Sequence, residues 1–352
     1  MNDEAYQMDG TYVMINEAEA SSVSLCDTYG RKLNSLRISL TQRCNLQCFF
    51  CHKEGQTTSS NELAPEEVGK IARVACELGM RKIKLTGGEP LLRDDLPDII
   101  REIAPFADEV SLTTNGVLLE EQAEDLSDAG LKRVNVSLCS TTREGFRRIT
   151  KRDCMLRVKD GVRAALQCGL FPVKINMVAL KGVNVHEIPK AIDFARETGT
   201  ILQLIEFQSI QRENSINWER FHYDLTLLEE ELKEKAISVE ENPLHKRRRY
   251  CLRRKGGLAC VELVHPMHNS EFCGNCTRLR ITSDGKLKPC LLRNDNLVDI
   301  ASLVRKGAEL SELKEAFKKA ALLREPYWRE ESEDQFETAR EILPTIKDGR
   351  HI

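Results

Sequence analysis

Apolar runs that alternate with amphipathic stretches constrain the fold of this chain more than any other feature. Six runs have the length and apolar character of β-strands, at 36–40, 82–86, 109–113, 133–138, 172–180 and 201–207. Five stretches show the apolar spacing of a helix, at 65–78, 96–103, 120–129, 157–168 and 187–198. Strands that alternate with helices form a parallel sheet with right-handed crossovers. The pattern predicts an α/β fold and leaves open whether the sheet is doubly wound or a partial barrel.

The pattern changes near residue 210, which predicts a second and smaller domain. A helix is expected at 225–235, then a basic stretch at 246–255, then short strands joined by turns. A chain of 352 residues is long enough for one barrel with an appendage. The expected units are an N-terminal arm at 1–30, a barrel at 31–210, an α+β domain at 211–325 and a tail at 326–352.

Composition excludes several classes of function. Hydrophobic residues make up 41% of the chain and charged residues 30%, and the formal net charge of -3 gives no field that attracts nucleic acid or a bilayer. No apolar run approaches the roughly 18 residues of a membrane helix, and no secretory signal is present. The basic stretch has only Tyr250 to stack on a base, so it is expected to be solvated surface. We therefore predict a cytoplasmic protein that binds neither membranes nor nucleic acid.

The chain contains thirteen cysteines, an unusually high number. Because the cytosol keeps thiols reduced, these cysteines are expected to serve metal binding or catalysis and not disulfides. Cys76 and Cys168 lie at apolar positions of predicted helices and are expected to be small core residues. Cys139, after the fourth strand, is expected to be a plain thiol.

Three cysteines lie directly after the first predicted strand. Cys44, Cys48 and Cys51 are close enough in the chain for their thiolates to hold one metal centre. If that centre is a four-iron cluster, one iron lacks a protein ligand, and an open coordination position allows chemistry. The alternative is a structural zinc site with His52 as the fourth ligand.

The second predicted strand ends in a Gly-Gly-Glu-Pro motif at 87–90. Two glycines let the backbone approach a ligand closely, and proline prevents further strand pairing. The end of this strand is therefore predicted to receive a small molecule.

A second cysteine triplet lies in the last third of the chain. Cys273 and Cys276 are separated by two residues, and Cys290 follows after an interval of thirteen. This triplet is also one short of the four ligands of a closed zinc site. Spacing alone leaves a zinc ribbon open, and the candidates for its fourth ligand are His268, Cys260 and Cys251.

A hairpin is predicted between the cysteines of this second triplet. An Asp-Gly pair at 284–285 marks a turn that brings the Cys290 end of the chain back beside the Cys273 end. Arg278 and Arg280 are two residues apart, so in a strand they share one face. Two guanidinium groups beside a metal centre suit a phosphorylated or otherwise anionic ligand.

The first triplet and the Gly-Gly-Glu-Pro motif together resemble the radical S-adenosylmethionine (SAM) enzymes. The resemblance implies a partial (β/α)6 TIM-like barrel whose site lies at the carboxyl ends of the strands. It also implies that Cys44, Cys48 and Cys51 bind a 4Fe-4S cluster and that SAM binds at the open iron. The positions that match SAM contacts in those enzymes are Phe50, Gly88, Ser137 and Gln208.

The second triplet and its surroundings resemble one family of that superfamily, the GTP 3′,8-cyclases of molybdenum cofactor biosynthesis. The resemblance covers about residues 24–300 and includes the stretch 268–273. It implies that the smaller C-terminal α+β domain binds a second 4Fe-4S cluster through Cys273, Cys276 and Cys290, with the purine of GTP at the open iron. The positions that match GTP contacts are Arg37, Lys84, Thr113, Lys174, Arg278, Leu279 and Arg280, with Lys82 as a further candidate.

The resemblance implies a radical reaction on GTP. A one-electron donor such as flavodoxin or ferredoxin reduces the first cluster, which cleaves SAM to methionine and a 5′-deoxyadenosyl radical. That radical takes hydrogen from C3′ of GTP, the C3′ radical adds to C8 of guanine, and the product is 3′,8-cyclo-7,8-dihydro-GTP. Cyclic pyranopterin monophosphate synthase acts next, and the resemblance leaves a homodimer open.

Four departures from the family pattern bear on these expectations. Lys84 stands in place of an arginine, which keeps the charge but loses the two-pronged donor geometry. Gln203 stands where many members have arginine, and Gln208 where they have methionine. The stretch 347–352 lacks the Gly-Gly pair with which familiar members end.

Other interpretations stay open on the sequence. One is a radical SAM enzyme with an auxiliary cluster that acts on a peptide or another substrate, which leaves Arg278 and Arg280 unexplained. Another is a regulatory zinc- or iron-binding protein, in which loss of a cysteine affects folding but no turnover. Each cation of the GTP set could also be a surface or structurally paired side chain. A P-loop is excluded, because no Gly-x4-Gly-Lys-Ser/Thr sequence is present.

Overall fold

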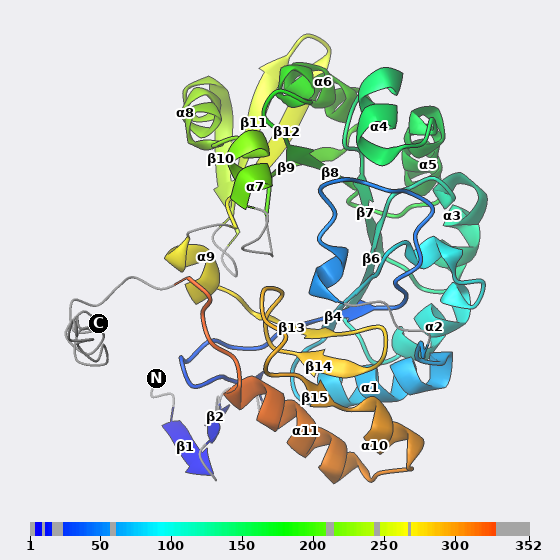
Figure 1. Ribbon diagram of the computed structural model, residues 1–352, viewed down its shortest axis with the longest axis vertical. Helices are drawn as coiled ribbons and strands as arrows, with labels where there is room; N and C mark the ends of the chain where they lie inside the picture. Colours follow the sequence, from blue (N-terminus) through cyan, green and yellow to red (C-terminus); the bar gives the residue numbers. More distant parts are fainter. Residues whose placement is uncertain are drawn as a thin grey trace, which may run out of the picture.

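Six parallel strands form the centre of the molecule. The structure is a computed structural model that describes residues 4–8, 11–15, 24–56, 61–208, 215–242, 247–266 and 269–328. Its central strands are β4 (Ser35–Ser39), β5 (Lys82–Thr86), β6 (Glu109–Thr114), β7 (Arg133–Ser137), β8 (Lys174–Ala179) and β9 (Ile201–Glu206). They pair in chain order, each parallel to the next, and the sheet curves as a partial barrel (Figure 1). The predicted α/β fold is confirmed.

Helices cover the outer face of the curved sheet (Figure 1). Those that the sequence predicts are α1 (Pro65–Glu77), α2 (Leu96–Ile103), α3 (Leu119–Asp128), α5 (Met155–Gln167) and α6 (Ile188–Thr198). The structure adds α4 (Arg143–Thr150), which the sequence pattern does not predict. This helix has eight residues, too few for a helical period to stand out, and the Thr142 hydroxyl caps it by accepting from the Gly145 N–H at 3.2 Å.

Side chains alternate between the two faces of each central strand. In β4, Leu36 and Ile38 are fully buried in the hydrophobic core, whereas Arg37 between them points to the inner face of the sheet. Lys84 has the same place in β5, where its neighbours are buried and apolar. Apolar packing against the helices therefore also directs charged side chains to the inside of the barrel.

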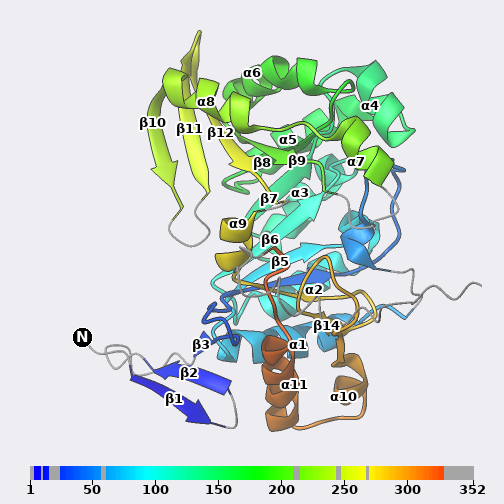
Figure 2. The ribbon, with the colours of Figure 1, turned by 60° about the vertical axis from the view of Figure 1, so that its left-hand side comes forward.

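The chain after residue 208 adds strands to both edges of this sheet. They are β10 (Ala236–Glu241), β11 (Arg248–Arg254), β12 (Gly257–Val264), β13 (Arg278–Ile281), β14 (Lys286–Lys288) and β15 (Val298–Asp299). At one edge β12 lies parallel to β9, and β11 and β10 follow it. At the other edge β13 lies parallel to β4, and β14 and β15 follow it. In the described ranges, the six added strands and the six central strands form one twelve-stranded sheet, which Figure 2 shows from a second side.

The C-terminal segment also contributes helices to the fold. They are α7 (Ser215–Phe221), α8 (Thr226–Lys235), α9 (Ser270–Gly274), α10 (Ala301–Arg305) and α11 (Leu310–Leu322). The predicted helix at 225–235 is confirmed as α8, which packs on β10 and β11, while α10 and α11 contact α1. Within the described ranges, no helix is long and apolar enough to cross a bilayer.

A small antiparallel sheet lies near the N-terminus. β1 (Glu4–Met8) pairs with β2 (Thr11–Ile15), and β2 pairs with β3 (Ser24–Leu25). These three short strands lie within the predicted N-terminal arm at 1–30, and the bounds of that arm stay a prediction. Of the predicted tail, only 326–328 belong to the described residues, so the position of the expected Gly-Gly pair lies outside them.

Cys251 and Cys260 form a disulfide between β11 and β12. They are direct partners in the antiparallel register, because one hairpin brings the two residues face to face. The prediction that the cysteines form no disulfide is wrong for this pair. Because both sulfurs are engaged, neither residue completes a zinc site at the second triplet, and His268, the other candidate, lies outside the described residues.

Candidate active site

The first cysteine triplet lies on the loop that follows β4. The Leu46 N–H donates to the sulfur of Cys44 at 3.4 Å, and the Lys53 N–H donates to the sulfur of Cys51 at 3.4 Å. Burial, together with the two neighbouring thiols, raises the pKa of Cys48 to about 12. Such a thiol ionises only when positive charge is brought to it, and N–H donors aimed at sulfur stabilise a metal-bound thiolate. The donor set therefore fits an iron–sulfur cluster.

The geometry does not favour a single zinc ion with His52 as a ligand. His52 Nδ1 accepts from the Glu54 N–H at 3.1 Å. Across the ranges that the structure describes, no three His, Cys, Asp or Glu side chains converge as ligands of one metal ion. Zinc ligands lie about 2.0–2.3 Å from the metal and must converge on one point, whereas the thiolates of a cluster bind different irons.

Gly87 and Gly88 bring the end of β5 against the cysteine loop. The Gly88 N–H donates to the Thr41 carbonyl at 2.7 Å, and the next N–H donates to the Arg43 carbonyl at 2.7 Å. A Cβ on Gly88 would lie 2.2 Å from the Arg43 oxygen, and one on Gly87 would lie 2.5 Å from the Thr41 oxygen. The predicted close approach thus exists toward the backbone of the cysteine loop, and contact of Gly88 with a ligand stays a prediction.

Glu89 ties the end of β6 to the same loop. It is fully buried before η2 (Pro90–Leu92) and accepts from Thr114 Oγ1 at 2.6 Å and from the Asn115 N–H at 2.6 Å. The Asn115 side chain in turn donates to Asn45 Oδ1 at 2.6 Å. Burial raises the pKa of Glu89 to about 7, although its hydrogen bonds favour the carboxylate. Glu89 therefore positions Asn115, which holds the loop between two of the cysteines.

Replacing Glu89 with glutamine is expected to destabilise the protein by about 1–3 kcal/mol, because an amide N–H2 then faces one of the buried donors and leaves it without an acceptor. A lower melting temperature and a lower iron content per chain after anaerobic reconstitution measure the effect. Glu121→Gln is the control, since it removes only an exposed ion pair with Arg157. Equal losses in both variants contradict this role of Glu89.

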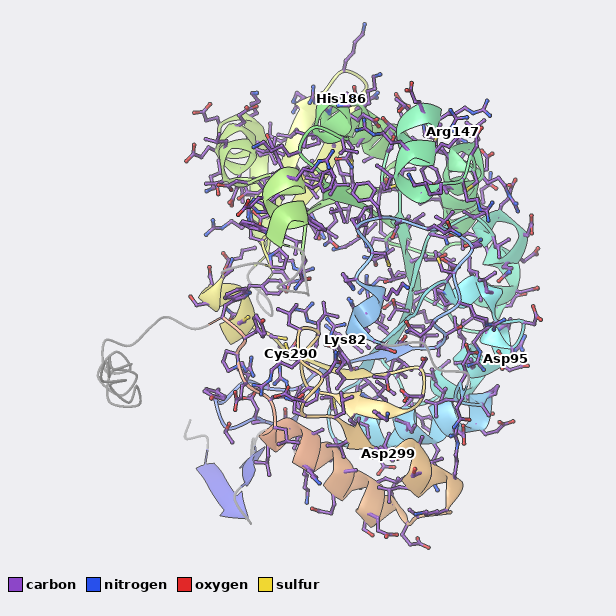
Figure 3. All side chains as sticks on the ribbon, in the orientation of Figure 1. Lys82, Asp95, Arg147, His186, Cys290 and Asp299 are labelled. Carbon is purple, nitrogen blue, oxygen red and sulfur yellow. A yellow bond between two sulfur atoms is a disulfide. The ribbon has the colours of Figure 1, made fainter. Side chains whose placement is uncertain are left out.

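The second cysteine triplet is assembled by α9 and the β13–β14 hairpin. The predicted hairpin is confirmed, since β13 and β14 pair antiparallel. Figure 3 shows Cys290, after β14, beside α9, which carries Cys273. Burial raises the pKa of Cys276, but Arg278 and Arg324 outweigh it and lower the pKa to about 6. The two arginines therefore favour the thiolate of Cys276, the form that binds iron.

Two buried arginines hold the backbone of this triplet. Arg31 Nη1 donates to the Cys273 carbonyl at 2.9 Å, and Arg324 Nη2 donates to the Cys276 carbonyl at 2.7 Å. The buried carboxylate of Asp27 joins the two arginines, with N–O distances of 2.7 Å to Arg31 and 2.5 Å to Arg324. The sequence interpretation missed this group, because Asp27 and Arg324 lie 297 positions apart and neither belongs to a local motif.

Four cations lie side by side across four neighbouring strands. In direct register, Lys288 of β14 pairs with Arg280 of β13. Arg280 pairs in turn with Arg37 of β4, and Arg37 with Lys84 of β5. We call these four residues the cation row. Burial lowers the pKa of Arg37 to about 9 and that of Lys288 to about 8, and Lys288 Nζ donates to the Gly55 and Arg293 carbonyls and to Asn294 Oδ1.

Glu54 is the carboxylate that faces the cation row. It belongs to η1 (Lys53–Gly55), and its oxygens lie 2.8 Å from Arg280 Nη1 and 3.5 Å from Arg37 Nη1. Burial alone raises the pKa of Glu54, but Arg37 and Arg280 lower it to about 2. Lys84 has no carboxylate among the described ion pairs and donates to Asn135 Oδ1 at 3.2 Å. Sequence reasoning missed Glu54, because nothing in its local pattern indicates these partners.

Lys174 belongs to a separate polar group at the β9–β12 edge. Its Nζ lies 2.6 Å from the Glu262 carboxylate, which also accepts from Gln203 Nε2 at 3.0 Å and from Arg249 Nη2 at 3.0 Å. Within the basic stretch, Arg249 thus points inward, whereas the exposed turn at 253–255 fits the predicted solvated surface. The structure therefore gives Lys174 a protein partner, and its contact with a substrate stays a prediction.

The remaining predicted contact residues lie in four places. The candidates for SAM, which are Phe50, Gly88, Ser137 and Gln208, end or follow β4, β5, β7 and β9, so they share the strand-end edge with the first triplet. Thr113 of β6 faces Asn135 of β7 in register. The Leu279 side chain is fully buried in the hydrophobic core, opposite in direction to its neighbours in β13. Lys82 is exposed at the start of β5 (Figure 3).

Three free cysteines outside the triplets have a sequence prediction, and two of them behave as predicted. Cys76 is buried in the core, and burial raises its pKa to about 11. Cys139 is also buried, and burial raises its pKa well above its usual value, so it is an unreactive thiol. Cys168 ends α5 and is only half-buried, which makes it a boundary residue and not a core one.

A histidine outside the predicted site links the C-terminal segment to β9. His265 Nδ1 lies 2.8 Å from Glu206 Oε1, and Nε2 lies 3.6 Å from Glu229 of α8. Both carboxylates and Asp224 line a cavity of about 560 Å³ beside this ring. Burial alone lowers the pKa of His265, but Glu206 and Glu229 raise it above its usual value.

This histidine predicts a pH dependence of stability. The folded state holds the proton on His265 more tightly than the unfolded state does. The contribution of His265 to the free energy of unfolding is therefore complete below about pH 6.5, and it is lost as the pH rises through the pKa of the folded state. The free energy of unfolding by denaturant is expected to fall between pH 6 and 8, and His265→Gln should flatten that slope. His186→Gln, at an exposed histidine, should not. A slope that is the same in both variants contradicts the prediction.

Two segments of the chain match known protein families. Residues 38–195 match the Radical SAM superfamily, and residues 200–330 match the family described as Molybdenum Cofactor Synthesis C. The boundary between the two matches lies before β9, close to the predicted change of pattern near residue 210.

Similar proteins are found among sequences and structures. A Thermococcus kodakarensis protein named probable GTP 3′,8-cyclase is 48% identical over 307 residues, which cover 87% of this chain and all of the relative. A Pyrococcus abyssi protein of the same name is 48% identical over 305 residues, with 86% and 99% covered. Streptococcus suis SuiB bound to S-adenosylmethionine shares the fold, with a TM-score of 0.60 at 18% identity over 82% of this chain and 69% of that chain.

Proposed function

Because the chain belongs to the GTP 3′,8-cyclase family of the radical SAM superfamily, we propose that its two cysteine triplets hold the redox centres of the cyclisation and that the cation row binds the triphosphate of GTP. The chain is an enzyme that binds an iron–sulfur cluster and SAM. It converts GTP to 3′,8-cyclo-7,8-dihydro-GTP, the first step of molybdenum cofactor biosynthesis.

The first triplet is the proposed site of the catalytic 4Fe-4S cluster. Cys44, Cys48 and Cys51 bind three irons, and N–H donors to two of the sulfurs stabilise the thiolates. When bound and reduced, this cluster supplies the electron that cleaves SAM. Phe50, Gly88, Ser137 and Gln208 bind SAM at the same edge of the barrel, where Glu89 and Asn115 keep the loop in place.

The second triplet is the proposed site of another 4Fe-4S cluster, close to the nucleotide. Cys273, Cys276 and Cys290 are its ligands, and the lowered pKa of Cys276 supports a bound iron. The Arg278 guanidinium lies 5.1 Å from the centre of the Phe272 ring, so its direction is fixed beside the triplet. The purine of GTP binds at this end of the barrel, with Leu279 contributing backbone.

The cation row is the observation that carries the proposal for GTP. β4 bears Arg37 and leads into the first triplet, whereas β13 and β14 bear Arg280 and Lys288 and adjoin the second triplet. A polyanion on this row is therefore held between the two metal-binding loops. Lys84, Arg278 and further contacts from Thr113 and Lys174 complete the substrate site. Fixed cations position the ribose for the reaction, and the enclosing barrel keeps water out.

The proposal includes the partners that the reaction needs. A one-electron donor such as flavodoxin or ferredoxin reduces the protein, and cyclic pyranopterin monophosphate synthase takes up the product. The single chain contains every residue of the proposed site, so the site does not require a second subunit. A homodimer stays a prediction.

An anaerobic assay tests this function. Iron- and sulfide-reconstituted protein is reduced and supplied with SAM and GTP, and both 5′-deoxyadenosine and the fluorescent pterin derived from the product are measured. GTP-dependent formation of both compounds supports the proposal. Cys44→Ala should abolish both, whereas Cys273→Ala should abolish the pterin. Deoxyadenosine without pterin in the unaltered protein points to another substrate, such as a peptide, and contradicts the assignment of GTP.

A further inference from the structure

A carboxylate from the first cysteine loop lies where the anionic substrate is expected. Glu54 follows Cys51 by three residues, and its side chain reaches the middle of the cation row. Only 8% of the residue is exposed. Among the described ion pairs, Glu54 is the one carboxylate on either Arg37 or Arg280. The longer contact, 3.5 Å to Arg37, leaves that guanidinium weakly satisfied, and its buried Nε has no hydrogen-bond partner in the described part of the chain.

The backbone that carries this carboxylate is strained. Lys53 has φ +49° and Glu54 has φ +52°, both in the left-handed region, although neither is glycine. Such a conformation is unfavourable for a residue with a side chain and persists only when other contacts hold it. The contacts of the Glu54 carboxylate with the arginines help to hold this turn. Their loss therefore allows the segment to relax.

The residues after Glu54 join the two metal-binding regions. The Gly55 carbonyl accepts from Lys288 Nζ at 3.1 Å. Gln56 Oε1 accepts from the Ser283 N–H at 3.1 Å, at the turn of the β13–β14 hairpin. The segment with Glu54 is therefore connected back to Cys51 along the chain and forward to the hairpin beside the second triplet.

We propose that Glu54 takes the place of a substrate phosphate while the site is empty and that the bound triphosphate displaces it from Arg37 and Arg280. A phosphate group carries more negative charge and more acceptor oxygens than one carboxylate, and two anions on the same arginines repel each other. Displacement releases the strained turn three residues from Cys51. Glu54 is thus a positioning residue that couples substrate binding to the cysteine loop.

This inference rests on the proposed GTP site and adds the coupling to it. By thermodynamic reciprocity, any state of the cysteine loop that disfavours the Glu54 contacts also favours GTP binding. The coupling gives a reason for SAM cleavage to depend on GTP: the loop changes only when substrate has replaced the carboxylate.

Glu54→Gln is the principal test, because glutamine keeps the size of the side chain but removes the competing charge. GTP affinity is measured by anaerobic calorimetry on the reconstituted protein without SAM. We expect about tenfold tighter binding, since weakening one charge-assisted hydrogen bond by about 1.4 kcal/mol changes affinity tenfold. Glu67→Gln weakens a more exposed ion pair with Arg305, away from the row, and should leave the affinity unchanged. Unchanged or weaker binding by Glu54→Gln overturns the inference.

Two further measurements extend the test, and the first uses only the unaltered protein, so it does not depend on how well the variant folds. In the unaltered protein, GTP should accelerate hydrogen exchange at the amides of Gly55 and Gln56, which the turn now protects through bonds to the His52 and Lys53 carbonyls. Slower or unchanged exchange overturns displacement. Glu54→Gln should also cleave SAM several-fold faster than the unaltered protein when GTP is absent. If the unaltered protein does not bind GTP at all, the proposed substrate site is wrong. If it binds GTP but Glu54→Gln binds GTP no more tightly, only the inference about Glu54 is wrong.

Discussion

Replacing Cys48 with alanine is expected to lower the rate of SAM cleavage by at least about a thousandfold, which corresponds to roughly 4 kcal/mol of activation free energy. The cysteine loop offers only three thiols, and Cys48 lies between the other two. With one removed, the cluster loses a third of its protein ligands, and the remaining two thiolates do not enclose it. The release of 5′-deoxyadenosine by reduced, reconstituted protein measures this loss.

Cys168→Ala is the matched control for the cysteine variant. Cys168 is a free, half-buried thiol at the end of α5 and belongs to neither triplet. This variant should keep full activity and the full iron content. Iron and sulfide analysis of the Cys48 variant should show the loss of one cluster and not of both. If that variant retains its complete iron content and its activity, the first triplet is not the catalytic centre.

Arg280→Ala is expected to weaken GTP binding by about 10- to 100-fold, because hydrogen bonds to charged groups contribute about 1.5–3 kcal/mol and more when the partner is left buried. Arg280 lies in the middle of the cation row, between Lys288 and Arg37, and is the closest partner of Glu54 at 2.8 Å. Loss of Arg280 leaves the triphosphate with one cation fewer, and it leaves Glu54 with only the longer contact, to Arg37. Calorimetry with GTP measures the change in affinity.

Two additional variants separate binding from stability at this position. Breaking a buried ion pair costs about 3–5 kcal/mol, so the melting temperature of Arg280→Ala should also fall. Arg280→Lys keeps the charge and should recover much of the stability but only part of the affinity, since lysine lacks the two-pronged donor. Arg305→Ala breaks a partly exposed ion pair on the surface and should change neither the melting temperature nor the affinity for GTP. Unaltered GTP affinity in Arg280→Ala contradicts the role of the cation row.

The central fold follows from local patterns in the sequence. The six strands and five of the helices are predictable because an alternating or helical arrangement of apolar residues directly encodes which face is buried. Prediction fails where that signal is short. α4 has eight residues, and its charged positions outnumber the buried Phe146, Ile149 and Thr150. A local pattern also predicts the β13–β14 hairpin, since an Asp-Gly turn between alternating residues is a short-range signal.

Partners that are distant in the chain leave no such signal. The Asp27–Arg324 ion pair joins the chain after β3 to the chain after α11, and the Lys174–Glu262 ion pair joins β8 to β12. The disulfide is a related case, because the expectation for Cys251 rested on the cellular environment and not on which strand lies beside it. Sequence patterns identify a charged residue in a strand, but they do not show what neutralises it.

The sequence by itself determined the alternating α/β core, both cysteine triplets and the family, because the pattern of each strand, helix or motif lies within a few dozen consecutive residues. Only the tertiary structure decided that β12 and β13 extend the barrel at opposite edges and that four cations fall into one register across β14, β13, β4 and β5. It also decided that Glu54 faces them. The physical reason is that register and long-range charge pairing depend on the packing of the whole sheet, whereas periodicity depends only on neighbours along the chain.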